Sequence, residues 1–221
     1  MSISKKLMTT GATEDTYVDD VFSTYVYEGE GIALKAIENG VNLEDNGGLV
    51  WIKCRSEPKI HILSDTERGP GWTLSSNTNT FEKQEGGQIK EFNSNGFSIG
   101  ASQEVNKPGG DFASWTFRKA PKFFDVVTYT GDRVAGREIP HNLGCVPGMV
   151  IVKSTSRSSN WSVLHKDAGL MYLNDNGAAY GEADTSTNFG DGTNRIDPTS
   201  TEFTVGISPN VNQTDDEYVA Y

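Results

Sequence analysis

The amino-acid sequence predicts an all-β protein: two tandem antiparallel β-sandwich modules of jelly-roll type, preceded by a short extended N-terminal arm. Three observations predict this fold. Short runs of apolar and β-branched residues alternate with turns rich in glycine and asparagine. No segment carries an apolar stripe of helical period over more than one or two turns. The same series of motifs occurs twice, about a hundred residues apart.

The internal repeat defines the expected domains. Four motifs of the first half return in the same order in the second half: Phe22–Gly29 as Phe124–Gly131, Leu49–Lys53 as Met149–Lys153, Asn95–Gly100 as Thr201–Gly206, and Asp111–Trp115 as Glu217–Tyr221. Their offsets are 102, 100, 106 and 106 residues. We therefore expect a first module over residues 22–119 and a second over residues 123–221, with residues 1–21 outside both.

Within each copy, the apolar runs Leu49–Ile52 and Met149–Val152 follow a glycine and have the length of buried strands. Turn signals such as Asn39-Gly40 and Asn176-Gly177 separate the runs. The link over residues 118–123 is short and contains a proline, which fixes one backbone angle. We expect a stiff joint between the modules.

The N-terminal arm is the first candidate for partner binding. Residues 2–16 are polar and lack an apolar period, so we expect no independent fold there. The next residues suit an edge strand that pairs once a partner is present, and the candidate partner-binding residues are Tyr17, Val18, Val21 and Phe22. A frayed terminus is the alternative interpretation.

The end of the second copy differs from that of the first. The strand that ends at Tyr221 corresponds to one that continues past Trp115. We expect the second module to be truncated and the chain to be the N-terminal part of a longer protein. A short last strand is the alternative.

Composition excludes several classes of protein. The formal net charge is −11 and the isoelectric point is near 4.7, which argues against binding a nucleic-acid backbone. The uncharged stretches are too short to span a bilayer. Two cysteines, Cys54 and Cys145, make neither a disulfide framework nor a metal site.

No catalytic motif is present, and we expect no catalytic, cofactor-binding or metal-binding residues. His61, His141 and His165 are isolated in sequence, and we expect His141 to bond a neighbouring backbone group within a proline-bounded turn. The loops Asn174–Gly177 and Asp191–Asp197 lack the residue order of a dedicated calcium loop, so we expect turns rich in aspartate and asparagine there, with oxygen ligands for calcium as the alternative.

Four further positions have specific expectations. Trp72 and Tyr180 lie in loop-like stretches, where we expect them to pack in the core or at an interface, with exposed platforms for a sugar ring or a neighbouring subunit as the alternative. Lys53 and its counterpart Lys153 follow apolar runs. We expect both lysines to reach solvent at strand ends.

Several of these segments together resemble a known family. Gly48–Lys53, Leu74–Asn77, Phe92–Phe97 and Ala113–Pro121 are similar to a repeat module of tail fibre proteins of tailed bacteriophages, of the marine and cyanophage type. Phe124–Gly131, Ile139–Gly144 and Pro147–Ser154 resemble the next module of the same kind. The resemblance covers about residues 17–221 and carries no catalytic residue. Cys54 stands where a small polar residue is more usual, which bears on redox sensitivity.

The resemblance implies a structural virion protein: the N-terminal part of a homotrimeric tail fibre, assembled in the host cytoplasm and anchored to a tail adaptor or baseplate protein. Host recognition would then lie beyond this chain. The alternative is a lectin-like module that binds a host surface glycan. A capsule depolymerase would need a β-helix pattern or a clustered carboxylate pair, and neither is visible in the sequence.

Overall fold

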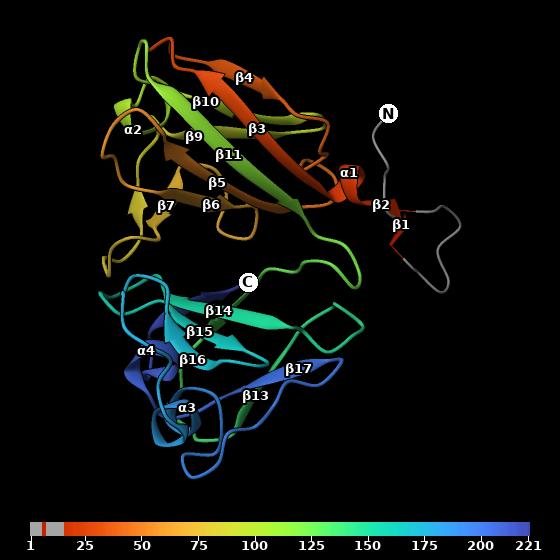
Figure 1. Ribbon diagram of the computed structural model, residues 1–221, viewed down its shortest axis with the longest axis vertical. Coiled ribbons are helices and arrows are strands. Elements are labelled where there is room, and N and C mark those ends of the chain that lie inside the picture. The colour runs from red at the N-terminus through yellow and green to blue at the C-terminus, as the bar shows by residue number, and fades with distance from the viewer. Residues whose placement is uncertain (1–5, 8–15) are drawn as a thin grey trace. The chain divides into compact units, whose positions relative to one another are not determined.

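The computed structural model describes residues 6–7 and 16–221, and its regular secondary structure is mostly antiparallel strand (Figure 1). The chain forms two compact units. The first extends to Ser75 and then from Lys83 to Phe124, and the second combines Ser76–Glu82 with Asp125–Tyr221. The expected boundaries at residues 22–119 and 123–221 differ from this division chiefly at residues 76–82.

The first unit contains two antiparallel sheets. The larger has the strand order β3 (Phe22–Glu28), β11 (Asp111–Arg118), β5 (Gly48–Cys54), β6 (Ile62–Asp65), β7 (Trp72–Ser75) and β8 (Lys83–Gln84). The smaller has the order β4 (Lys35–Glu38), β10 (Gly96–Ile99) and β9 (Ile89–Asn93). Fully buried apolar side chains from both sheets, among them Ile52 and Phe97, form one core.

The second unit repeats this plan with fewer strands. Its larger sheet has the order β12 (Val127–Thr130), β18 (Glu217–Ala220), β14 (Met149–Ser154), β15 (Ser162–His165) and β16 (Gly169–Tyr172). The smaller pairs β13 (Arg137–Pro140) with β17 (Glu202–Val205). Side chains such as Val152 and Phe203 fill the core between these sheets. The predicted all-β fold of sandwich type is confirmed.

A buried asparagine ends a one-turn helix in each unit: α2 (Gln103–Asn106) in the first and α4 (Pro209–Asn212) in the second. Each amide donates to the carbonyl of a glycine six residues earlier, Gly100 or Gly206, at 2.9 Å. A buried backbone carbonyl needs such a partner, because leaving it unbonded costs about 1–3 kcal/mol. The repeat thus retains a polar side chain that satisfies the backbone.

A tyrosine, half-buried in the first unit and buried in the second, occupies the same place in both units. The hydroxyl of Tyr27 donates to the carbonyl of Val105 at 2.8 Å, and that of Tyr129 donates to Val211 at 2.7 Å. Burial raises the pKa of both phenols well above the usual value, so they stay neutral hydrogen-bond donors. Each tyrosine therefore links its sheet to the one-turn helix.

The segment Ser76–Glu82 belongs to the second unit although it lies between two strands of the first. The indole Nε1 of Trp161 donates to the carbonyl of Thr78 at 3.0 Å, and the amide of Ser159 donates to Asn79 at 2.9 Å. Trp161 is fully buried. The segment is therefore an integral part of the second unit.

The N-terminal residues that the structure describes form short elements of secondary structure. β1 (Lys6–Leu7) pairs with β2 (Thr16–Tyr17), and the one-turn helix α1 (Val18–Val21) follows directly. The expected absence of a fold over residues 2–16 falls mostly outside the described residues. The longest helix in the described part of the chain is α3 (Glu182–Asn188), and no helix there has the length and apolar character needed to cross a membrane.

Candidate functional site

The four residues predicted to bind a partner differ in exposure. Tyr17 is 39 % exposed and Val18 is half-buried, whereas Val21 is fully buried. Phe22 is half-buried, with its ring centroid 4.9 Å from that of Phe117. Val21 is the last residue of α1, and its side chain is fully buried, so it cannot contact a partner in this conformation. Partner binding by the other three stays a prediction.

The large exposed apolar side chains of the first unit belong to one stretch of its sequence, which includes strand β3. Every large exposed apolar residue described in that unit lies within residues 17–34: Tyr17, Tyr25, Val26, Ile32 and Leu34. Those of the second unit are spread from Phe81 to Ile207. A concentration of exposed apolar residues in one segment is typical of an interaction surface.

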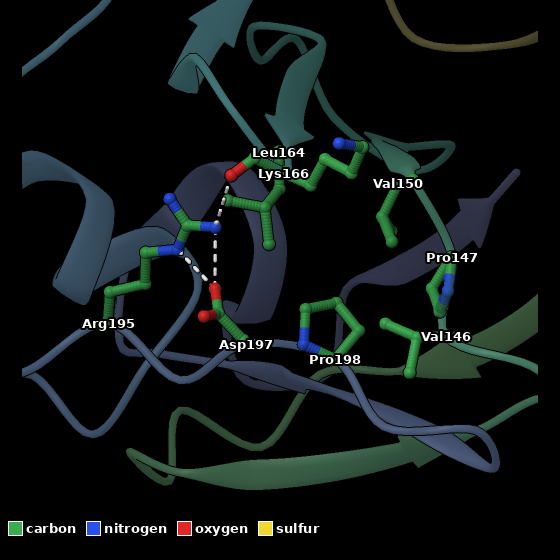
Figure 2. Close-up of a pocket in the computed structure, with 9 residues that line it drawn as sticks. Val146, Pro147, Val150, Leu164, Lys166, Arg195, Asp197 and Pro198 are labelled. Carbon is green, nitrogen blue, oxygen red and sulfur yellow. Dashed lines mark hydrogen bonds and ion pairs between the residues drawn. The ribbon is translucent and has the colours of Figure 1, made fainter.

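A small pocket opens in the second unit (Figure 2). Its volume is about 140 Å³, below the roughly 300–1,000 Å³ of most ligand pockets, so it suits one small group. It is lined by Val146, Pro147, Gly148, Val150, Leu164, Lys166, Arg195, Asp197 and Pro198. Figure 2 shows apolar side chains on one side of the pocket and the Arg195–Asp197 pair on the other.

The polar side of the pocket is held by an ion pair. Nε of Arg195 donates to Asp197 at 2.6 Å, and its Nη2 donates to the carbonyl of Lys166 at 3.3 Å. The Lys166 ammonium pairs with exposed Asp167 at 2.7 Å. That pair is exposed on both sides, so it contributes little to stability.

A shorter loop accounts for the pocket. In the first unit eleven positions separate Ile37 from Gly48, and the loop between them buries Val41 and Leu43 completely. In the second unit only nine positions separate the equivalent Ile139 from Gly148. The shorter loop brings fewer side chains into the core and instead lines the pocket. The prolines and the glycine of this loop predict a shaped turn, whereas no pattern in the sequence indicates a pocket.

Lys153 does not reach solvent, contrary to the expectation for the strand ends. It is fully buried, and its Nζ donates to the carbonyl of Ser154 at 2.8 Å and to the hydroxyl of Ser159 at 3.2 Å. Burial lowers the pKa of its ammonium to about 7. Lys53 is half-buried, and its Nζ donates to the carbonyl of Lys59 at 3.2 Å. The loop after each strand folds over its lysine, which is why neither extends outward.

Two of the histidines have structural partners. Nδ1 of His141 accepts from the amide of Leu143 at 3.2 Å, and Nδ1 of His165 accepts from that of Asp167 at 3.2 Å. Each of these hydrogen bonds closes a short turn from the histidine to the amide two residues later, as expected for His141. Burial lowers the pKa of His61, which disfavours its charged form.

The two acidic loops form turns capped by aspartate. Asp191 accepts from the amides of Thr193 and Asn194 at 2.8 and 2.7 Å, and these bonds lower the pKa of its carboxyl. Asp175 accepts from the hydroxyl of Tyr180 at 2.9 Å, which lowers its pKa likewise. Across residues 6–7 and 16–221, no group of three or more histidine, cysteine or acidic side chains is placed to hold a metal ion.

The two aromatic residues expected in loops are half-buried. Trp72 begins strand β7, so its expected loop position is wrong. The ring of Tyr180 lies 4.7 Å from that of Tyr172 in an edge-on contact. The partial burial of these two residues favours packing over a role as exposed platforms.

A comparison with protein families found a match that includes residues of both units. The model of a family described as a domain of unknown function, DUF7483, matches residues 18–221. The chain belongs to the DUF7483 family. The match runs through both units and includes β3, the pocket and the segment Ser76–Glu82. Comparisons with curated proteins and with solved structures found no match.

Proposed function

We propose that the chain is a structural component of a phage virion, the part of a tail fibre that anchors the fibre to a tail adaptor or baseplate protein. The observation that carries this proposal is the gathering of the first unit's exposed apolar side chains within residues 17–34. A surface of this kind suits attachment to a partner.

The repeated framework supports the proposal. Polar side chains that recur at equivalent positions, such as Asn106 with Asn212 and Tyr27 with Tyr129, bond to backbone groups. What recurs is therefore scaffold, as in the fibre modules that the sequence resembles. A homotrimer in the virion and a non-enzymatic role belong to the same proposal.

Particle assembly tests attachment. Phage carrying the full chain without residues 1–20 should assemble particles that lack the fibre, detected by mass spectrometry and electron microscopy of purified particles. Tyr17→Glu, which alters one exposed side chain, should reduce incorporation in the same direction. Thermal melts of the purified variants separate loss of attachment from loss of folding. Normal fibre incorporation by a folded deletion variant contradicts attachment through residues 1–20.

A second candidate function is glycan binding, and the pocket favours it. Its aliphatic walls suit the C–H face of a sugar, and Lys166 at its rim suits a carboxylate, so an acidic sugar is the matching ligand. A glycan array with and without calcium tests this function. Binding that disappears in Lys166→Ala but persists in Lys90→Ala supports a lectin. Absence of binding favours the structural role.

A further inference from the structure

The first strand of the large sheet in the first unit has a free edge. β3 (Phe22–Glu28) pairs with β11 along seven residues, from Phe22 opposite Phe117 to Glu28 opposite Asp111 (Figure 1). No strand in the described part of the chain pairs with its other side. Every second residue of such a strand directs its amide and carbonyl groups outward, where another strand can bond to them.

Other sheet edges carry features that block strand addition. These features are charged residues or proline in the edge strands: Lys35 and Glu38 in β4, Lys83 in β8, Lys90 and Glu91 in β9, Arg137, Glu138 and Pro140 in β13, and Glu202 in β17. β16 is covered by the amide of Tyr180, which donates to Leu170 at 2.8 Å. In β12, which has only four residues, the carbonyl of Thr130 accepts from Arg137.

β3 lacks these features over all of its residues but the last, Glu28. Residues 22–27 are uncharged, contain no proline, and pair with β11 without a register shift. Tyr25 and Val26 are 38 % and 60 % exposed. A long, unbroken edge whose central residues are uncharged is the form to which an extended peptide adds most readily.

Acidic side chains lie at both ends of this edge. Asp19 and Asp20 precede the strand, and Glu28, with Asp111 opposite it, ends the strand. All four are exposed. The edge is therefore apolar in its middle and negative at its ends, which defines the charge of a complementary strand.

We propose that the free edge of β3 binds an extended segment of a partner protein, with apolar residues in its middle and lysine or arginine near its ends. This inference rests on the proposed function, because it specifies how the attachment partner is held. A second copy fits poorly. Two antiparallel β3 strands centred on Tyr25 would pair Glu28 of each with Phe22 of the other, so the acidic residues that flank the two strands would gather at the same ends of the pair, and like charges that approach across strands are destabilising.

Synthetic peptides and the purified full chain test this proposal. The probe is a fluorescently labelled nine-residue peptide of alternating valine and threonine with a lysine at each end, titrated by fluorescence anisotropy. It should bind the wild-type chain, and a version with glutamate at each end should bind at least tenfold more weakly. Methylating alternate amide nitrogens on the edge that faces β3 should abolish binding, because it removes the donors that strand addition needs.

Two matched variants locate the site. Val26→Lys should weaken binding of the lysine-ended peptide at least tenfold, whereas Val134→Lys, at a residue 58 % exposed in the second unit, should leave it unchanged. Equal binding by both variants, undiminished binding of the methylated peptide, or no binding at millimolar peptide overturns the proposal. A dimer in sedimentation that Val26→Lys dissociates would identify a second copy as the occupant and overturn it too.

These results separate the two proposals. Fibre loss from particles lacking residues 1–20, together with no peptide binding, would keep attachment and reject strand addition. Peptide binding with normal incorporation of the deletion variant would reject attachment through residues 1–20.

Discussion

The two units share a framework but fill it differently. Gly29 and Gly131 are equivalent, and a Cβ at either would lie 2.1 Å from a backbone carbonyl, so the close approach of two backbone segments recurs. Asp65 and Arg68, by contrast, form a buried ion pair in the first unit, whereas the equivalent residues of the second are His165 and Ala168. The comparison teaches that the repeat preserves backbone geometry and backbone hydrogen bonds. Side chains that fill the remaining space are free to differ.

The largest difference should appear at Trp161, whose counterpart in the first unit is His61. Trp161→Ala removes a fully buried ring and its bond to Thr78, and should lower the free energy of unfolding of the second unit by about 3–5 kcal/mol. Urea unfolding followed by hydrogen exchange in each unit measures this loss. His61→Ala should cost well below that, since His61 is only half-buried. Equal losses would contradict the comparison.

The buried ion pair should come next. Arg68→Ala leaves the buried Asp65 carboxylate without the arginine that lies 2.6 Å away, at a cost of at least about 3 kcal/mol to the first unit. The double variant Asp65→His, Arg68→Ala installs the residues of the second unit. It should recover part of that loss, because no unpaired carboxylate remains. A double variant less stable than Arg68→Ala would show that the two units do not tolerate each other's side chains here.

Lys153 predicts a pH dependence. Its folded-state pKa is lowered to about 7, while an unfolded lysine keeps its proton up to about pH 10. Between these values the unfolded state binds more protons, so the stability of the wild-type chain should rise with pH relative to Lys153→Met, by about 1–2 kcal/mol from pH 7 to 9. Below pH 7 the difference should be constant. Chemical unfolding at several pH values, with Lys53→Met as the matched variant, measures it, and parallel curves above pH 7 would refute it.

The smallest effect should follow from an exposed arginine of the second unit. Arg157 lies 3.5 Å from Asp216, with 39 % of its side chain exposed. Arg157→Ala should change the free energy of unfolding by less than about 1 kcal/mol. Together with Arg68→Ala it separates a buried from an exposed ion pair. A loss above about 2 kcal/mol would remove that distinction.

The repeat made much of the fold predictable from the sequence. Motifs that recur at matching spacing, such as Leu49–Lys53 and Met149–Lys153, became equivalent strands because strand pairing depends on alternation and on turn signals. The exposure of Lys153 was not predictable, because burial depends on how the loop after the strand folds back. Trp72 was misplaced for a similar reason, since only its pairing with Gln84 shows that it lies in a strand.

The candidate sites were less predictable than the fold. The pocket joins Pro147 to Arg195 and Pro198, residues that lie in separate loops with no shared motif. The free edge of β3 follows from strand order, which no local pattern of residues 22–28 contains. Tyr17 and Phe22 drew attention as apolar residues in a polar stretch, but only the structure separates them from buried Val21.

The segment Ser76–Glu82 has a consequence for how the protein is made. During synthesis it leaves the ribosome before the residues that bind it, since Thr78 and Trp161 are 83 positions apart in the chain. Domains usually fold one after another as they emerge, N-terminal first. Here the earlier domain holds a seven-residue stretch whose native contacts are not yet translated. Expression of either half alone would divide this contact, so cloning boundaries drawn at residues 119–123 would remove part of the second domain.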